Sequence, residues 1–159
     1  MARKTCKKSQ YRRKGQSLIS AKKISPENWH LSAEEIRQAL ELLNITVKTV
    51  KKVHYLKHQV CISWWDEKGK VCSSFFSYRI FARWQAEVER LIWACHSLKE
   101  FYKVILYIQY DLDYFPYPVE VSDAIARALE NRETELRVAA EAVETAALRA
   151  SQAAWPSSR

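Results

Sequence analysis

The chain has 159 residues, which suits one ordinary domain with a short tail, and its apolar residues are plentiful enough for a core. Gly15 and Gly69 are the only glycines, so the sequence excludes a glycine-rich phosphate loop and a dinucleotide-binding fingerprint. The formal net charge is +8, and because the cations gather in the N-terminal half, the sequence favours an anionic partner such as nucleic acid.

The first 24 residues are basic, polar and without periodicity, which is typical of an arm that is disordered alone and orders on binding. Nine Lys and Arg side chains and no acid fall within residues 1–23. Arg12, Arg13 and Lys14 are the candidates for phosphate contacts in this arm. We therefore expect three parts: a basic disordered arm over residues 1–24, an α+β domain over 25–118, and a long alanine-rich C-terminal helix over 119–159.

The first predicted helix begins after Ser32. Ser32 and Glu35 have the spacing of a capping box, in which each side chain satisfies a backbone N–H group of the other residue. The helix then continues to about residue 44, with one apolar face formed by Ile36, Leu40 and Leu43.

Three strands follow, over residues 47–55, 60–65 and 71–78, because β-branched and aromatic residues alternate there. A break or bulge is expected in the first strand at its paired lysines, and a hairpin turn is expected around Gly69, which tolerates a positive φ. The candidate phosphate contacts in this second basic segment are Lys48, Lys51, Lys52 and Lys57.

The C-terminal half is predicted to contain a helix over 80–99, a buried strand over 102–110, a loop over 111–118 and a final helix from 119 or 122 toward 153. An apolar seam of seven-residue spacing suits one partner helix, from this chain or a second copy, and consists of Leu129, Leu136, Val143 and Ala150. The expected fold class is α+β, with a three- or four-stranded, mostly antiparallel sheet packed by helices.

Aromatic residues concentrate on the hairpin and the helix after it. Strand alternation requires Trp64 and Trp65 to point to opposite faces of the sheet, and the sequence does not decide which one is buried. A face with exposed aromatic side chains beside lysines would be a stacking platform for single strands. The alternative is that both faces are covered, by helices or by a partner.

Four cysteines, Cys6, Cys61, Cys72 and Cys95, are few and irregularly spaced, so we expect free thiols in a reducing compartment. Cys61 and Cys72 flank the hairpin turn nearly symmetrically, which makes them candidates to face each other. No compact pair of metal ligands occurs, so we expect no metal, and we expect no cofactor and no catalytic residue.

The segments QVCISWWDEKGKVCSSFFSY and QAEVERLIWACHSLKEFYKVILYIQYD resemble the middle of the ribonuclease H-like fold, over about residues 59–112. The resemblance implies that Glu87 takes the place of the glutamate that opens the helix in that fold. It also implies a buried strand that ends in an aspartate, where this chain has Gln109, with Asp111 two residues later. The first-strand aspartate of the family is missing, because no aspartate precedes Asp66. A divergent metal-dependent nuclease using Glu87 and Asp111 is therefore the least favoured function.

The sequence thus favours a non-enzymatic, nucleic-acid-binding accessory or regulatory protein, with DNA and RNA both open as partners. The rival is a protein–protein adaptor of viral or mobile-element type that acts through its aromatic side chains and the helix over 119–153, with the arm as an import signal. No apolar run is long enough to cross a membrane and no secretory signal is apparent. We expect an intracellular location, nuclear in a eukaryotic host and otherwise cytoplasmic.

Overall fold

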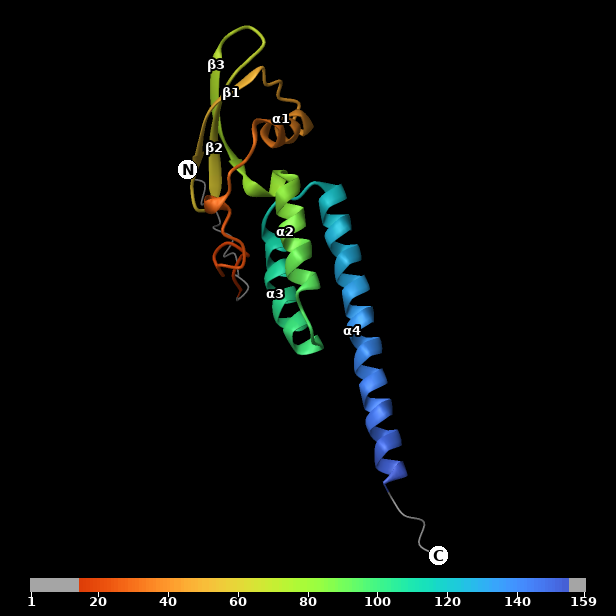
Figure 1. Ribbon diagram of the computed structural model, residues 1–159. Helices are drawn as coiled ribbons and strands as arrows, with labels where there is room; N and C mark the ends of the chain where they lie inside the picture. The colour runs from red at the N-terminus through yellow and green to blue at the C-terminus, as the bar shows by residue number, and fades with distance from the viewer. Residues whose placement is uncertain (1–14, 155–159) are drawn as a thin grey trace, which may run out of the picture.

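The computed structural model describes residues 15–154 as a small sheet joined to a helical half (Figure 1). The elements are η1 (Pro26–Asn28), α1 (Ala33–Leu42), β1 (Thr49–Tyr55), β2 (Gln59–Trp65), β3 (Val71–Ser77), η2 (Tyr78–Ile80), α2 (Ala82–Trp93), α3 (Leu98–Tyr114) and α4 (Val119–Ala153). The strands form an antiparallel sheet in the order β1-β2-β3. The predicted α+β class, antiparallel sheet and long C-terminal helix are confirmed.

Local signals in the sequence determine the sheet and the first helix. The pairing of β1 with β2 shifts register between Val50 and Lys52, as predicted, and Gly69 has a φ of 76° in the turn. The capping box of α1 forms, because Ser32 Oγ accepts from the Glu35 N–H at 3.1 Å while Glu35 accepts from the Ser32 N–H at 2.8 Å. Glu35 also accepts two hydrogen bonds from Arg83, which ties α1 to α2.

The register of the hairpin separates two cysteines, Cys61 and Cys72, that were candidates to face each other. Cys61 lies opposite Phe75, and Cys72 lies opposite Trp64. The prediction is wrong because the pairing is symmetric about residue 68 and not about the midpoint between the two cysteines. Both thiols are free and partly buried.

The buried strand predicted over 102–110 is wrong, since these residues belong to helix α3. Ser97 caps α3 by accepting from the Glu100 N–H, and the fully buried positions are Phe101, Ile108 and Asp111, which share one helical face. Leu106, in the middle of the apolar run, is 69% exposed. Packing against α2 and α4 overrides the local β-propensity of the segment. The helix predicted over 80–99 is accordingly divided between α2 and the start of α3.

The disordered arm predicted over residues 1–24 is wrong for its last part. Leu18, Ile19 and Ile24 are buried in the core, and the Leu18 N–H donates to Asp111 at 3.1 Å. These apolar residues follow no helical or strand period, but they gain enough burial to order the segment. Residues 1–14 lie outside the described part of the chain, so the prediction for them stays a prediction.

A buried ion pair joins the sheet to the helical half. Arg79, in η2 just after β3, donates to both carboxylate oxygens of Asp111 on α3 at 2.7 Å, and both side chains are almost fully buried. Asp111 also accepts from the Tyr117 hydroxyl at 2.6 Å, and Tyr117 in turn accepts from the Trp84 indole at 2.8 Å. The Arg79 guanidinium lies 3.7 Å from the centre of the Phe115 ring. With the segment around Leu18, whose N–H also donates to Asp111, five segments of the chain meet at this charge pair.

Replacing Asp111 by Asn should destabilise the fold strongly, because it leaves the Arg79 guanidinium buried without a counter-charge. We expect the free energy of unfolding in urea to fall by about 3–5 kcal/mol. Glu34→Gln is the matched control, since it removes an exposed carboxylate that bonds Arg37 at 2.9 Å, and it should cost about 1 kcal/mol or less. Equal losses in the two variants would contradict the structural role given to the buried pair.

The buried tyrosines predict a loss of stability at alkaline pH. Burial, with a further effect from Glu27, raises the pKa of Tyr78 to about 12, and burial beside Asp111 raises the pKa of Tyr117. The pKa of a tyrosine in the unfolded chain is about 10, which is lower than the pKa of either buried tyrosine in the folded protein. The folded state therefore binds these protons more tightly, and this contribution to stability is complete below the unfolded pKa and is lost as the pH rises above it. The free energy of unfolding should be level up to pH ~10 and then fall. Tyr78→Phe should reduce the steepness of that fall, and an unchanged pH profile would contradict the assignment.

Candidate nucleic-acid interface

The two faces of the sheet have different surroundings, and this decides which tryptophan is buried. Val60, Ile62 and Trp64 on β2 point toward α1 and the core, and Trp64 is 6% exposed. Trp65 points to the opposite face, which we call the outer face, and is 38% exposed. Figure 1 shows α1 on one side of the sheet and no described helix covering the other side.

Two exposed aromatic side chains lie on the outer face. Trp65 lies opposite Val71, and Phe75, which is 59% exposed, lies opposite Cys61. Because Cys61 and Trp65 are four residues apart on one strand, the two rings are separated by roughly 13 Å along the sheet. Between them Ser63 and Ser73 share a hydrogen bond of 3.0 Å. The outer face therefore has two exposed aromatic rings with a polar row between them.

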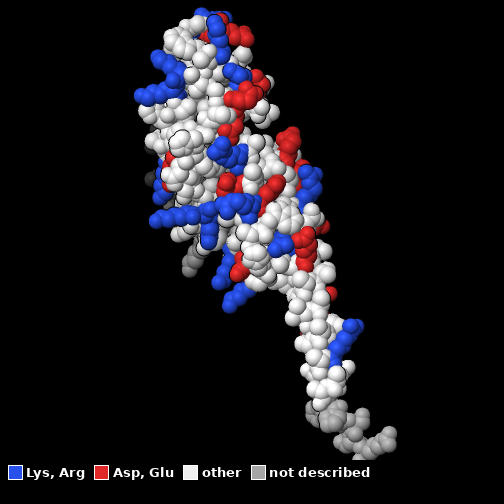
Figure 2. Space-filling model, viewed as in Figure 1, with Lys and Arg blue, Asp and Glu red and all other residues white. Residues whose placement is uncertain are grey.

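Lysines of β1 border these rings. Lys52 lies opposite Ser63, and its side chain points to the outer face. The bulge turns Lys51 toward the same face, with its Nζ atom 5.3 Å from the centre of the Trp65 ring. Figure 2 shows Lys and Arg side chains projecting from the sheet on the side away from α1. Cationic side chains thus lie beside an exposed indole.

The other predicted phosphate contacts are less concentrated. Lys48 is exposed just before β1, and its backbone N–H donates to the Trp65 carbonyl at 2.9 Å, so it lies at the same end of the sheet. Lys57 is exposed in the turn between β1 and β2, at the opposite end. Arg12, Arg13 and Lys14 lie outside the described residues. The structure therefore brings Lys51 and Lys52 together on the outer face, places Lys48 at the same end of the sheet, and separates Lys57 from them.

Reasoning from sequence did not place Phe75 and the serine pair on this surface. The hairpin turn contained the necessary signal, because a pairing centred on residue 68 places Phe75 opposite Cys61 and Ser73 opposite Ser63. Once Trp65 is known to be exposed, this register assigns Phe75 and Ser73 to the same face as Trp65. His54, which lies opposite Cys61, belongs to the same surface.

The two carboxylates of the nuclease alternative have other partners. Asp111 accepts four hydrogen bonds, from Arg79, Leu18 and Tyr117, so no oxygen lone pair is left for a metal ion at this fully buried position. Glu87 accepts from Arg90 on the same helix at 2.7 Å. Within residues 15–154, no cluster of three or more His, Cys, Asp or Glu side chains could hold a metal ion.

Comparison with known proteins gives no family for this chain. No family model, no curated protein and no solved structure matches it. The resemblance to the ribonuclease H-like fold stays an expectation, although the strand that it implied before Asp111 is a helix. Among the helices of residues 15–154, none is both long and apolar enough to span a membrane.

Proposed function

We propose that the protein binds single-stranded nucleic acid on the outer face of the sheet, without chemistry, as an accessory or regulatory factor. The observation that carries the proposal is the exposure of Trp65 and Phe75 on one face, bordered by Lys51 and Lys52. Exposed rings beside cations suit a partner that has both flat bases and phosphates. An intracellular location, nuclear in a eukaryotic host, fits this role.

The binding mode follows from what each side chain can do. Bases stack on the Trp65 and Phe75 rings, while Lys51, Lys52 and Lys48 neutralise phosphates at one end of the sheet. A single strand is favoured over a duplex because stacking on a side chain requires an accessible base face. The hydroxyl groups of Ser63 and Ser73 lie where a base or sugar between the two stacked bases would pass. The proposal includes RNA and DNA.

The basic residues before Gly15 add charge to this interface in the proposed mode. Arg12, Arg13 and Lys14 would contact phosphates that lie beyond the sheet. A truncated chain that tests them has to begin at Gly15, because removal of residues 17–24 would also remove Leu18 and its hydrogen bond to Asp111.

Replacing Trp65 or Phe75 by Ala should weaken binding to a labelled single strand. Loss of one stacked base corresponds to a roughly 5- to 150-fold higher Kd in fluorescence polarisation. Trp93→Ala is the matched control, since Trp93 is 41% exposed, like Trp65, but lies on α2 and not on the sheet. The Kd of this variant for the strand should equal that of the unaltered chain. Lys51→Gln should lower the dependence of log Kd on log salt by about 0.7, the contribution of one phosphate on a single strand. If Trp65→Ala and Trp93→Ala bind equally well, the outer face is not the interface.

A second candidate function, protein–protein association, is favoured by the free end of α4. Every residue from Arg137 to Ala154 is exposed, and Figure 1 shows α4 continuing past the ends of α2 and α3. Val143 lies on the seven-residue seam and is 70% exposed. The occupant that we propose is a second copy in antiparallel orientation, because that arrangement sets Arg137 of each copy near Glu144 of the other and packs Val143 on Ala140.

Sedimentation of the full chain should then show a concentration-dependent dimer. Val143→Lys should raise the dimer dissociation constant by about tenfold or more, because it places a charge in the centre of the seam. Val138→Lys is the matched control, since Val138 is also exposed on α4 but lies on the side away from the seam. A monomer at all concentrations, or equal effects of the two substitutions, would overturn this candidate.

A further inference from the structure

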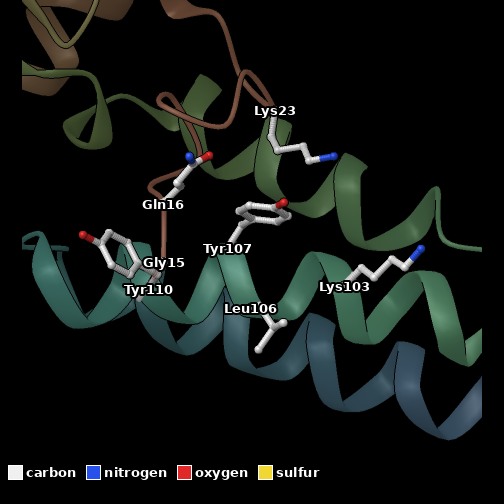
Figure 3. A pocket seen from close by; sticks show the side chains of 7 residues that line it. All are labelled: Gly15, Gln16, Lys23, Lys103, Leu106, Tyr107 and Tyr110. Atoms are coloured by element: carbon white, nitrogen blue, oxygen red, sulfur yellow. The ribbon is translucent and has the colours of Figure 1, made fainter. Parts of the chain in front are cut away.

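A groove of about 650 Å³ lies between the first described residues and helix α3. We call it the α3 groove. Residues Gly15, Gln16 and Lys23 form one side, and Lys103 and Tyr107 belong to the other (Figure 3). Its volume lies within the range of small-molecule sites, and its lining includes no carboxylate.

The walls of the groove are fixed by packing on both sides. Leu18 and Ile19 anchor the first segment in the core, and the Leu18 N–H donates to Asp111. Gly15 passes directly over Tyr110, where a Cβ atom would lie 2.4 Å from a ring carbon, so any other residue here would have to displace the Tyr110 ring. The Tyr110 ring packs against Tyr114, with ring centres 4.4 Å apart and the ring planes tilted by 33°. The groove is therefore formed before any ligand arrives.

The chemistry of the lining combines cations with an aromatic face. The Lys23 ammonium lies 5.3 Å from the centre of the Tyr107 ring, and Lys103 lies one helical turn before Tyr107 on the same face of α3. In Figure 3 both lysine side chains extend in the same direction, with the Lys23 ammonium nearer the Tyr107 ring and the Lys103 ammonium farther from it. Gln16 adds a side-chain amide, which both donates and accepts hydrogen bonds. A ligand that satisfies all three features has an anionic group, a flat ring and polar ring edges.

We propose that the α3 groove binds one nucleotide of a single strand, with the base on Tyr107 and the phosphate between Lys23 and Lys103. This inference rests on the function proposed above and adds a second contact site outside the sheet. The sequence also supports it, since Gly15 lines the groove and the basic residues Arg12, Arg13 and Lys14 immediately precede Gly15 in the chain.

The test uses a single strand that contains 5-bromouracil, with binding by fluorescence polarisation and photo-crosslinks located by peptide mass spectrometry. Tyr107→Leu should raise Kd roughly 5- to 150-fold, whereas Tyr107→Phe, which keeps the ring, should bind like the unaltered chain. Lys103→Gln should lower the salt dependence by about 0.7, and Lys99→Gln, an exposed lysine of the same helix outside the groove, should leave the salt dependence unchanged. Crosslinks should include the peptide that carries Tyr107.

The outcomes separate this inference from the proposed function. If Trp65→Ala weakens binding while Tyr107→Leu matches Tyr107→Phe and no crosslink reaches α3, the sheet interface stands and the groove proposal is overturned. If Tyr107→Leu and Lys103→Gln weaken binding while Trp65→Ala and Phe75→Ala do not, the groove stands and the sheet interface is overturned. An unaltered chain that binds no single strand at low salt overturns both. The thermal unfolding midpoint of each variant is measured as a control for folding. Because Lys103 is exposed, Lys103→Gln should leave that midpoint unchanged, so weaker binding of this variant would report lost contacts and not lost fold.

Discussion

The ion pair between Arg79 and Asp111 is the interaction on which the arrangement of the molecule depends. Two charges removed from water at this depth are costly unless every hydrogen-bonding group finds a partner. Here the carboxylate accepts four hydrogen bonds and the guanidinium lies between the Phe115 and Trp84 rings, 3.7 Å and 4.7 Å from their centres. The partners come from segments far apart in the chain, so the charges are satisfied only when those segments meet. The pair therefore selects one relative placement of the sheet and the helical half.

Both proposed binding surfaces are connected to this pair. Arg79 lies in η2, two residues after the end of β3, which carries Phe75 on the outer face of the sheet. Leu18, which bonds Asp111, lies only three residues after Gly15 at the edge of the α3 groove. A strand that contacts both surfaces would therefore meet two sites whose separation is set by buried contacts and not by a flexible linker. Such preorganisation lowers the entropic cost of binding the second site after the first.

The sequence predicted the elements whose signals are local, namely the capped first helix, the bulged first strand, the hairpin turn and the long last helix. It failed where tertiary contacts decide. The run from Tyr102 to Tyr110 is apolar and short, so its period did not separate a strand from a buried helix, and packing with α2 and α4 determined the result. Leu18 and Ile24 belong to no helical or strand pattern of apolar residues, so their burial could not be predicted from the sequence. Of the candidate site, the lysines of β1 could be predicted, but the exposure of Trp65 could not, because alternation assigns faces without showing which one is covered.

The lysines of β1 alone would be a weak argument for a binding surface, since charged side chains on an edge strand also prevent strands of different molecules from pairing. That role requires no exposed aromatic ring. Phe75 lies on β3, at the other edge of the sheet, and is 59% exposed, which is a cost in water that edge protection does not explain. Trp65, on the central strand, lies between Val71 of β3 and the ammonium group of Lys51. Exposed rings at two positions and cations beside one of them are jointly explained by a ligand that stacks and carries negative charge, and a single-stranded nucleic acid has both properties.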